Sequence, residues 1–235
     1  MLLEGETEPN LYPTWLKFLA PNMRKEEFIE KLDNNSFYVK GGLGYPGILD
    51  KEHGLTNTLK DISEYQNINQ LWIVCDADNQ AVETREHFIK SRISELLAED
   101  KSLSISHCDI HIIIQKACIE TWGLANKRVF PRSNIVPPFD EYVAFYDVGI
   151  DDPEQMIKPD SYEYSIGRYH EGYLKQMLFA KAKQSNKTKR AYSKTDPTPL
   201  DKEFYLKSII TRMEQDNHMD SFKKFYTLAL QLNQS

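Results

Sequence analysis

The chain has 235 residues, a formal net charge of −6 and a 40% apolar content, which is enough for a hydrophobic core and excludes a globally disordered or collagen-like protein. No apolar run approaches the ~20 residues needed to cross a bilayer, and the first residues lack the basic and long apolar stretches of a signal peptide, so we expect no membrane partner. Three cysteines are too few for a disulfide framework, which indicates a reducing, cytoplasmic location.

The N-terminal two-thirds of the chain alternates short apolar runs with amphipathic, helix-like patterns. In chain order the predicted elements are a strand at 2–3, helices at 9–20 and 24–33, a strand at 36–40, a helix at 56–65, a strand at 71–75, a helix at 81–98, a strand at 109–114 and a helix at 118–127. Strands that alternate with helices are typical of an α/β domain with a mainly parallel sheet flanked by helices. The chemistry of such domains lies beyond the carboxyl ends of the strands.

The C-terminal third has a different pattern. Residues 131–159 are rich in Pro and Asp and show little periodicity, so we expect an irregular connection there. Two amphipathic stretches, 201–216 and 219–232, are predicted to pack as a helical pair. We therefore expect an α/β domain, with its chemistry at the strand ends, over 1–130 and, over 131–235, a connection and helical region packed on that domain.

One tract is strongly basic. Residues 181–194 hold six Lys or Arg and no acid, and removing those six would change the net charge from −6 to −12. An acidic body with one basic tract suits a metal site with a local phosphate-binding element, although a solvated lysine-rich loop has the same composition. We expect this tract to be exposed and to contact nucleic acid without reading its sequence, through Lys187, Lys189 and Arg190.

Two aspartates follow the most apolar predicted strand, at 71–75. In Asp76-Ala-Asp78, two carboxylates lie so close together that their repulsion favours a bound divalent cation. Mg²⁺ is suited to one or two carboxylates together with water and substrate phosphates. The alternative is a polar turn in which Asp78 and Asn79 cap the following helix.

A second acidic cluster follows the first predicted strand. Glu4 is at the end of that strand, and Gly5 allows the backbone to approach closely. If a helical turn begins here, Glu4 and Glu8 lie on the same side of it, because they are four residues apart. The alternative is that these glutamates are only charges favoured by the N-terminal end of a helix dipole.

The two clusters taken together resemble the TOPRIM domain, a fold shared by topoisomerases, primases, recombination proteins and nucleases of the overcoming-lysogenization-defect type. The first TOPRIM motif is a hydrophobic strand followed by Glu and Gly, as in Leu2-Leu3-Glu4-Gly5; the second is a hydrophobic strand that ends in DxD, as in residues 72–78. Glu8 is placed like a second acid of the nuclease branch. The segment 119–122, Ile-Glu-Thr-Trp, is similar to a third element in small bacterial defence proteins, so the resemblance covers roughly residues 1–125.

The resemblance implies a nuclease that depends on Mg²⁺ or Mn²⁺ and acts as an anti-phage defence effector on DNA or RNA. Phosphodiester cleavage needs charge neutralised on the phosphate and an activated water, and divalent ions can supply both. In the family the first Glu also serves as general acid or base, which would be the role of Glu4. The implied metal ligands are Glu4, Glu8, Asp76, Asp78 and Glu120.

A cation is also expected opposite the metal, where it would hold the phosphate. Lys40 is one candidate, because it ends a predicted strand beside two glycines, and we assign it a catalytic role. Lys127, Arg128 and Arg132 follow the predicted helix that contains Trp122, and they are candidates for binding nucleic acid. Trp122 itself suits base stacking or, more simply, a place in the core.

Two other functions are compatible with the same residues. The first is a non-catalytic or latent module that acts through a protein partner, for example as a regulatory subunit of a defence complex. The acidic net charge and the lack of a broad basic face favour such a partner. The second is a different metal-dependent DxD enzyme, such as a nucleotidyl- or glycosyltransferase, which would require a nucleotide-sugar or nucleotide donor.

Overall fold

A computed structural model describes residues 1–41, 44–49, 54–133, 135–184 and 192–233. Within these residues the main sheet is four-stranded and wholly parallel, in the order β4-β1-β5-β6. Its strands are β1 (Leu2–Leu3), β4 (Lys40–Gly41), β5 (Gln70–Asp76) and β6 (Asp109–Gln115). A separate parallel pair is formed by β2 (Arg24–Lys25) and β3 (Ser36–Phe37). The predicted α/β class with a mainly parallel sheet is confirmed.

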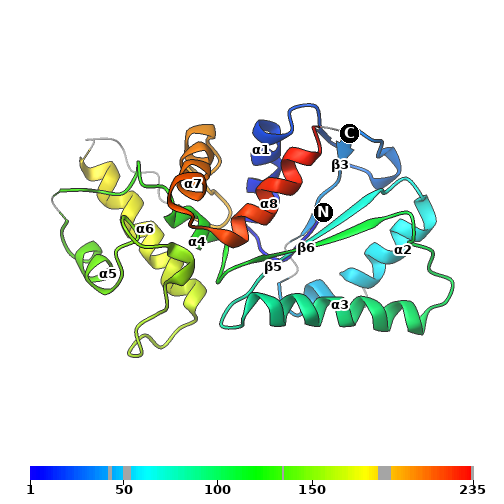
Figure 1. The fold of residues 1–235 in the computed structure, drawn as a ribbon, viewed down its shortest axis with the longest axis horizontal. Helices are drawn as coiled ribbons and strands as arrows, with labels where there is room; N and C mark the ends of the chain where they lie inside the picture. The colour runs from blue at the N-terminus through cyan, green and yellow to red at the C-terminus, as the bar shows by residue number, and fades with distance from the viewer. Residues whose placement is uncertain (42–43, 50–53, 134, 185–191, 234–235) are drawn as a thin grey trace.

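Helices cover both faces of this sheet, with α1 and α8 on one face and α2 and α3 on the other, while α4 to α7 lie past the ends of β5 and β6 (Figure 1). The α-helices are α1 (Glu8–Leu19), α2 (Leu55–Tyr65), α3 (Val82–Glu99), α4 (Ile119–Leu124), α5 (Phe139–Phe145), α6 (Ile166–Gln184), α7 (Glu203–Asp216) and α8 (Asp220–Gln231). Short 3₁₀ turns occupy Ile29–Lys31, Gly47–Leu49 and Pro153–Gln155. No helix in the described part of the chain has the length and apolar character required to cross a membrane.

The central strand β5 explains the two cores, because successive side chains of a strand point to opposite faces. Leu71, Ile73 and Cys75 are buried against α2 and α3. Trp72 and Val74 are buried in a second cluster, against α1 and α8. Since both faces are covered, the strand is apolar throughout, and this is why its sequence predicted a buried strand so clearly.

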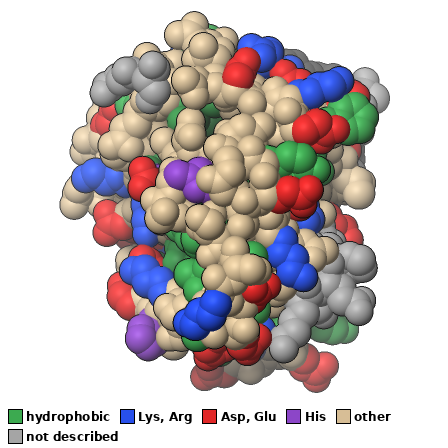
Figure 2. Space-filling view, turned by 90° about the vertical axis from the view of Figure 1, so that its right-hand side faces the viewer, with side chains coloured by type: hydrophobic (Ala, Val, Ile, Leu, Met, Phe, Trp, Pro, Cys, Tyr) green, Lys and Arg blue, Asp and Glu red, His purple; other side chains and the backbone are tan. Residues whose placement is uncertain are grey.

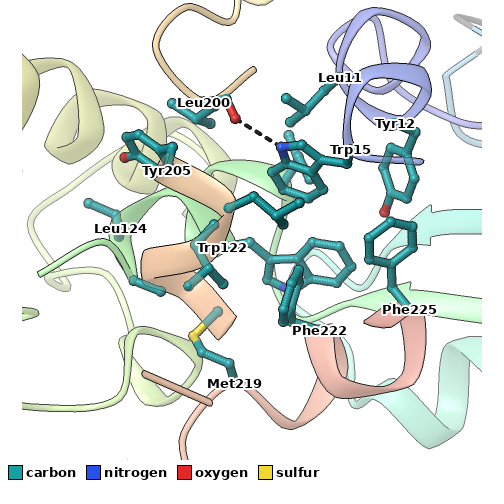
Figure 3. Close-up of a cluster of buried hydrophobic side chains, with 14 of the residues drawn as sticks. Leu11, Tyr12, Trp15, Trp122, Leu124, Leu200, Tyr205, Met219, Phe222 and Phe225 are labelled. Atoms are coloured by element: carbon teal, nitrogen blue, oxygen red, sulfur yellow. Dashed lines mark hydrogen bonds between the residues drawn. The ribbon is translucent and has the colours of Figure 1, made fainter. Parts of the chain in front are cut away.

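An aromatic cluster joins the N-terminal and C-terminal parts of the chain (Figure 3). Trp15 of α1 stacks on Trp122 of α4, with ring centroids 6.4 Å apart, and Phe222 of α8 meets Trp122 edge-on at 5.2 Å. The Trp15 indole N–H donates to the Leu200 carbonyl, at 2.8 Å. Trp122 is therefore a core residue, and the boundary expected at residue 130 does not separate two hydrophobic cores.

The predicted helix at 24–33 is wrong. Arg24 and Lys25 instead pair with Ser36 and Phe37 as β2 and β3, and only a 3₁₀ turn follows at Ile29–Lys31. The physical reason is a lack of burial: Phe28 is half exposed, and the 3₁₀ turn contains no buried residue. An isolated helix of this length without a buried face is marginal in water.

Predictions for the strand at 36–40, the region 131–159 and the C-terminal helical pair were only partly correct. The strand predicted at 36–40 is divided between β3 and β4, which belong to different sheets. The region 131–159 contains α5 as well as irregular chain, because Phe139 is buried against Phe130 and Tyr173. The last helix, α8, packs against α1 and β6 as well as α7, so it completes the sheet's cover instead of simply forming one half of a terminal pair.

Ser221 provides a test of how the C-terminal region is attached. Its hydroxyl donates to Glu154 Oε1 (2.5 Å) and accepts from the Trp122 indole N–H (2.9 Å). We expect Ser221→Ala to lower the free energy of unfolding by about 2 kcal/mol, because a buried carboxylate and a buried N–H each lose a partner. Urea denaturation measures this, with the exposed Ser94→Ala as control; equal effects of the two changes would contradict the attachment.

Candidate functional site

Acidic side chains from distant parts of the sequence meet at the carboxyl edge of the sheet. Glu4 directly follows β1, and Asp76 is the last residue of β5. The strands are in register, with Leu3 opposite Val74, and the Asp76 backbone N–H donates to Glu4 Oε2 at 3.0 Å. The first and second clusters predicted from sequence therefore lie together in the folded chain.

Glu8 is brought into the same group by the turn that follows β1. It is the first residue of α1 and is almost fully buried. A Cβ atom at Gly5 would lie 2.1 Å from Glu8 Oε2 and 2.8 Å from its Cδ, so any other residue at position 5 would displace this carboxylate. A glycine is thus required after Glu4 for a local steric reason, because it leaves room for the Glu8 carboxylate.

Burial and mutual repulsion disfavour the charged forms of the carboxyl groups at this edge. Burial raises the pKa of Glu8 to about 7, and the nearby carboxylates of Glu120 and Glu4 contribute to this rise. Burial also raises the pKa of Asp76 well above its usual range, with Glu8, Glu4 and Glu120 as further causes. For Glu4 the main cause of a raised pKa is again burial, opposed by the hydrogen bond from Asp76. Four carboxyl groups thus share one poorly solvated region.

Glu120 joins this region from α4, as the sequence predicted. It is buried, and its Oε1 accepts a hydrogen bond from the Tyr192 hydroxyl at 2.7 Å. Lys194, two residues after Tyr192, interacts with the same acids. Desolvation lowers the pKa of Lys194, but the Glu120 and Glu171 carboxylates outweigh it and raise that pKa overall.

Asp78 behaves differently from Asp76. Its backbone has φ of 51°, in the left-handed region, and its side chain is 45% exposed. Asp78 Oδ2 lies 3.2 Å from a guanidinium nitrogen of Arg85, on the first turns of α3. The DxD pair therefore divides into one buried acid inside the group and one acid at its rim, paired with a cation.

Lys40 does not lie with the carboxylates. Its ammonium is 3.7 Å from Asp61 Oδ2, in the wall of a cavity of about 390 Å³ that is also lined by Gln70 and Trp72. Those residues begin β5, so the cavity is at the amino ends of the strands, opposite the acidic edge. Figure 2 shows this side of the molecule, where charged side chains of both signs surround recessed hydrophobic ones.

The other predicted cations are on the surface or outside the described residues. Lys127 forms an ion pair with Asp216, while Arg128 and Arg132 are exposed. Lys187, Lys189 and Arg190 lie outside the described residues, so their contact with nucleic acid stays a prediction. The expectation that the whole tract is exposed is wrong at its described ends, because residues 181–184 belong to α6 and Tyr192 is buried with its hydroxyl on Glu120.

Sequence reasoning missed two cations near the acids, Arg85 and Lys194. A signal for Arg85 existed: it has helical spacing with Ile89 and Ile93, so it is a charged residue on the buried face of α3. Lys194 was visible only as the last residue of the basic tract. Nothing in the sequence distinguished it from its neighbours, because its approach to Glu120 depends on tertiary structure.

The donor chemistry of the acidic group fits a hard divalent cation. All of the side chains offer oxygen, and Asp76 Oδ1 is buried without a hydrogen-bond partner among the described residues. In the described chain, no three His, Cys, Asp or Glu side chains are grouped so that they could hold an ion between them. One or two carboxylates are enough for Mg²⁺ when water and substrate phosphates supply the other ligands.

Comparison of the chain with protein-family models, with curated proteins and with solved structures finds no match. A function for this site therefore has to be inferred from its own side chains: buried carboxyl groups at the carboxyl edge of a parallel sheet, with Arg85 and Lys194 beside them.

Proposed function

We propose that the protein is a TOPRIM-type nuclease that cleaves phosphodiester bonds with Mg²⁺ or Mn²⁺, in the manner of an anti-phage defence effector. The observation that carries this proposal is the meeting of Glu4, Glu8, Asp76 and Glu120 at the carboxyl edge of the sheet. Buried carboxyl groups that raise one another's pKa are costly for the fold, and such clusters occur where they have a function.

Asp76 and Glu4 are the residues that would hold the ion, with Glu8 and Glu120 in support. A bound divalent cation would neutralise charge on the scissile phosphate and lower the pKa of a water molecule. The protein's own contribution is positional. The Asp76 N–H fixes one oxygen of Glu4, and burial raises the pKa of Glu4, which favours a role as general acid or base.

Lys194 replaces Lys40 as the proposed phosphate-facing cation. It interacts with Glu120 and Asp76, whereas Lys40 is paired with Asp61 at the opposite edge. Its position as the last residue of the basic tract would also let nucleic acid pass from the tract to the carboxylates.

The test is incubation of single- and double-stranded DNA and RNA with Mg²⁺, Mn²⁺ or a chelator. We expect cleavage that requires the metal and disappears in the chelator. If no substrate is cleaved with either metal, and calorimetry detects no Mn²⁺ binding, the proposal is wrong. A second candidate, a latent module controlled by a protein partner, is favoured by the acidic net charge of −6. Mn²⁺ binding without cleavage would support it.

Glu120 allows a quantitative test of the supporting acids. We expect Glu120→Gln to lower the cleavage rate about 10- to 100-fold, because side chains that support metal ligands have effects of this size. The change keeps an oxygen for the Tyr192 hydroxyl, so folding should be unaffected. Single-turnover cleavage measures the rate, with the exposed Glu141→Gln as control. A rate within twofold of wild type would show that Glu120 is a carboxylate at the start of a helix with no role in cleavage.

A further inference from the structure

Arg85 is an unusual residue beside the acidic group. It projects from α3 and is buried, with its side chain only 3% exposed. One guanidinium nitrogen, Nη2, donates to Asp78 Oδ2 at 3.2 Å, and the charge of Arg85 also acts on Glu4. A buried cation therefore contacts the rim acid of the DxD pair and acts electrostatically on the first acid of the chain.

Most of the donors of Arg85 are unused. Both Nε and Nη1 are buried and have no hydrogen-bond partner in the part of the chain that the structure describes. Leaving a buried donor unpaired costs free energy, more so when the donor is charged. The buried Arg212 shows the contrast, since its guanidinium donates to the carbonyls of Val148 (2.6 Å) and Asp151 (2.5 Å).

The Tyr45 side chain forms a cover over Arg85. The Tyr45 ring centroid lies 3.8 Å from the guanidinium carbon, and the ring also meets Phe88 edge-on at 6.4 Å. Tyr45 is 36% exposed, so its ring contacts solvent as well as Arg85. The preceding Gly44 has open space beside it and donates its N–H to the Glu4 carbonyl, which places this cover at the end of β1.

We propose that Arg85 binds a non-bridging oxygen of the substrate's phosphate, and that rotation of Tyr45 uncovers it. This inference rests on the proposed nuclease function and deepens it. The planar guanidinium presents parallel N–H groups that match a phosphate in a bidentate way, which an ammonium cannot do. Nη1 has no partner among the described residues, and its outer N–H lies parallel to the second N–H of Nη2, so these are the donors that an incoming oxyanion would satisfy. Because Glu4 and Asp78 repel a free anion, this binding requires the divalent cation.

The test measures the affinity for inorganic phosphate in Mg²⁺, from the rise in melting temperature as phosphate is added. Arg85→Met should weaken phosphate binding about 10-fold or more, whereas Arg85→Lys keeps the charge and should have an intermediate effect. Arg92→Met, on the more exposed part of the same helix, is the matched control and should bind as wild type does. Tyr45→Ala should strengthen phosphate binding, since the cover is removed. If Arg85→Met and Arg85→Lys both bind phosphate as the wild type does, the proposal is wrong.

Cleavage kinetics separate this inference from the proposed function. We expect Arg85→Lys to raise KM for an oligonucleotide and to lower kcat, while Mn²⁺ binding measured by calorimetry is retained. If the wild-type protein cleaves the oligonucleotide, and Arg85→Lys has an unchanged KM and an unchanged phosphate affinity, the role of Arg85 is wrong and the nuclease function is still supported. Loss of phosphate binding in Arg85→Met, in a protein whose wild type cleaves no nucleic acid, would support the oxyanion site and overturn the nuclease.

Discussion

Asp76→Asn is expected to lower metal-dependent cleavage on the order of 10³-fold and to leave the fold intact or slightly more stable. The loss follows because the change removes a charged ligand from the centre of the acidic group, where an electrostatic contact has effects of this size. The gain in stability follows because Asp76 is surrounded by Glu8, Glu4 and Glu120, which together with burial disfavour its charged form. Asparagine keeps the shape and removes the charge.

The measurement pairs single-turnover cleavage with thermal unfolding at pH 8. Asp78→Asn should also abolish cleavage, and asparagine tolerates the left-handed backbone at that position. Asp109→Asn, on the exposed first residue of β6, is the control and should change neither quantity. A sharp drop in melting temperature with full activity would identify Asp76 as a structural residue and contradict the site.

The second large effect is the pH dependence of stability in the metal-free protein. The pKa of Glu8 is raised from 4.5 to about 7 in the folded chain, so the folded state binds a proton that the unfolded state has released. Stability from this group is fully present below pH 4.5 and is lost as pH rises through about 7. The difference corresponds to about 3 kcal/mol of unfolding free energy. Glu4 and Asp76 act with the same sign, since their pKa values are also raised.

Urea denaturation at intervals from pH 5 to pH 8, in a chelator, measures this effect. We expect Glu8→Gln to raise the unfolding free energy above the wild-type value more at pH 8 than at pH 5, because the wild-type Glu8 loses its proton over that range. The lowered pKa values of His170 and of the N-terminal amine act with the opposite sign and are common to both proteins. Adding Mg²⁺ should restore stability most strongly above pH 7, because the ion binds the ionised carboxylates. Glu83→Gln, which is exposed on α3, should keep the wild-type slope. A Glu8→Gln variant whose stability differs from that of the wild type by the same amount at pH 5 and at pH 8 would show that Glu8 is not buried as described.

Local sequence patterns were sufficient to predict the strands of the main sheet and the edge at which their acids meet. The runs at 2–3, 71–75 and 109–114 are apolar because both sheet faces are covered, and each is a strand of the main sheet. In a parallel sheet the carboxyl ends of these strands meet at one edge, so the sequence predicts that Glu4 and Asp76 lie close together. Local pattern failed at 24–33, where charge and an exposed Phe28 left no buried face to hold a helix.

Which cations lie near the acidic group depends on tertiary contacts and could not be read from local sequence. Lys40 and Lys194 look alike in sequence, but Lys40 pairs with Asp61 at the amino ends of the strands, whereas Lys194 interacts with Glu120. Arg85 reaches the group because α3 packs on the sheet and turns its buried face toward Glu4. The interactions of Lys194 and Arg85 with the acids are between residues far apart in the chain. Their electrostatic energy depends on burial and distance, which the local sequence pattern does not give.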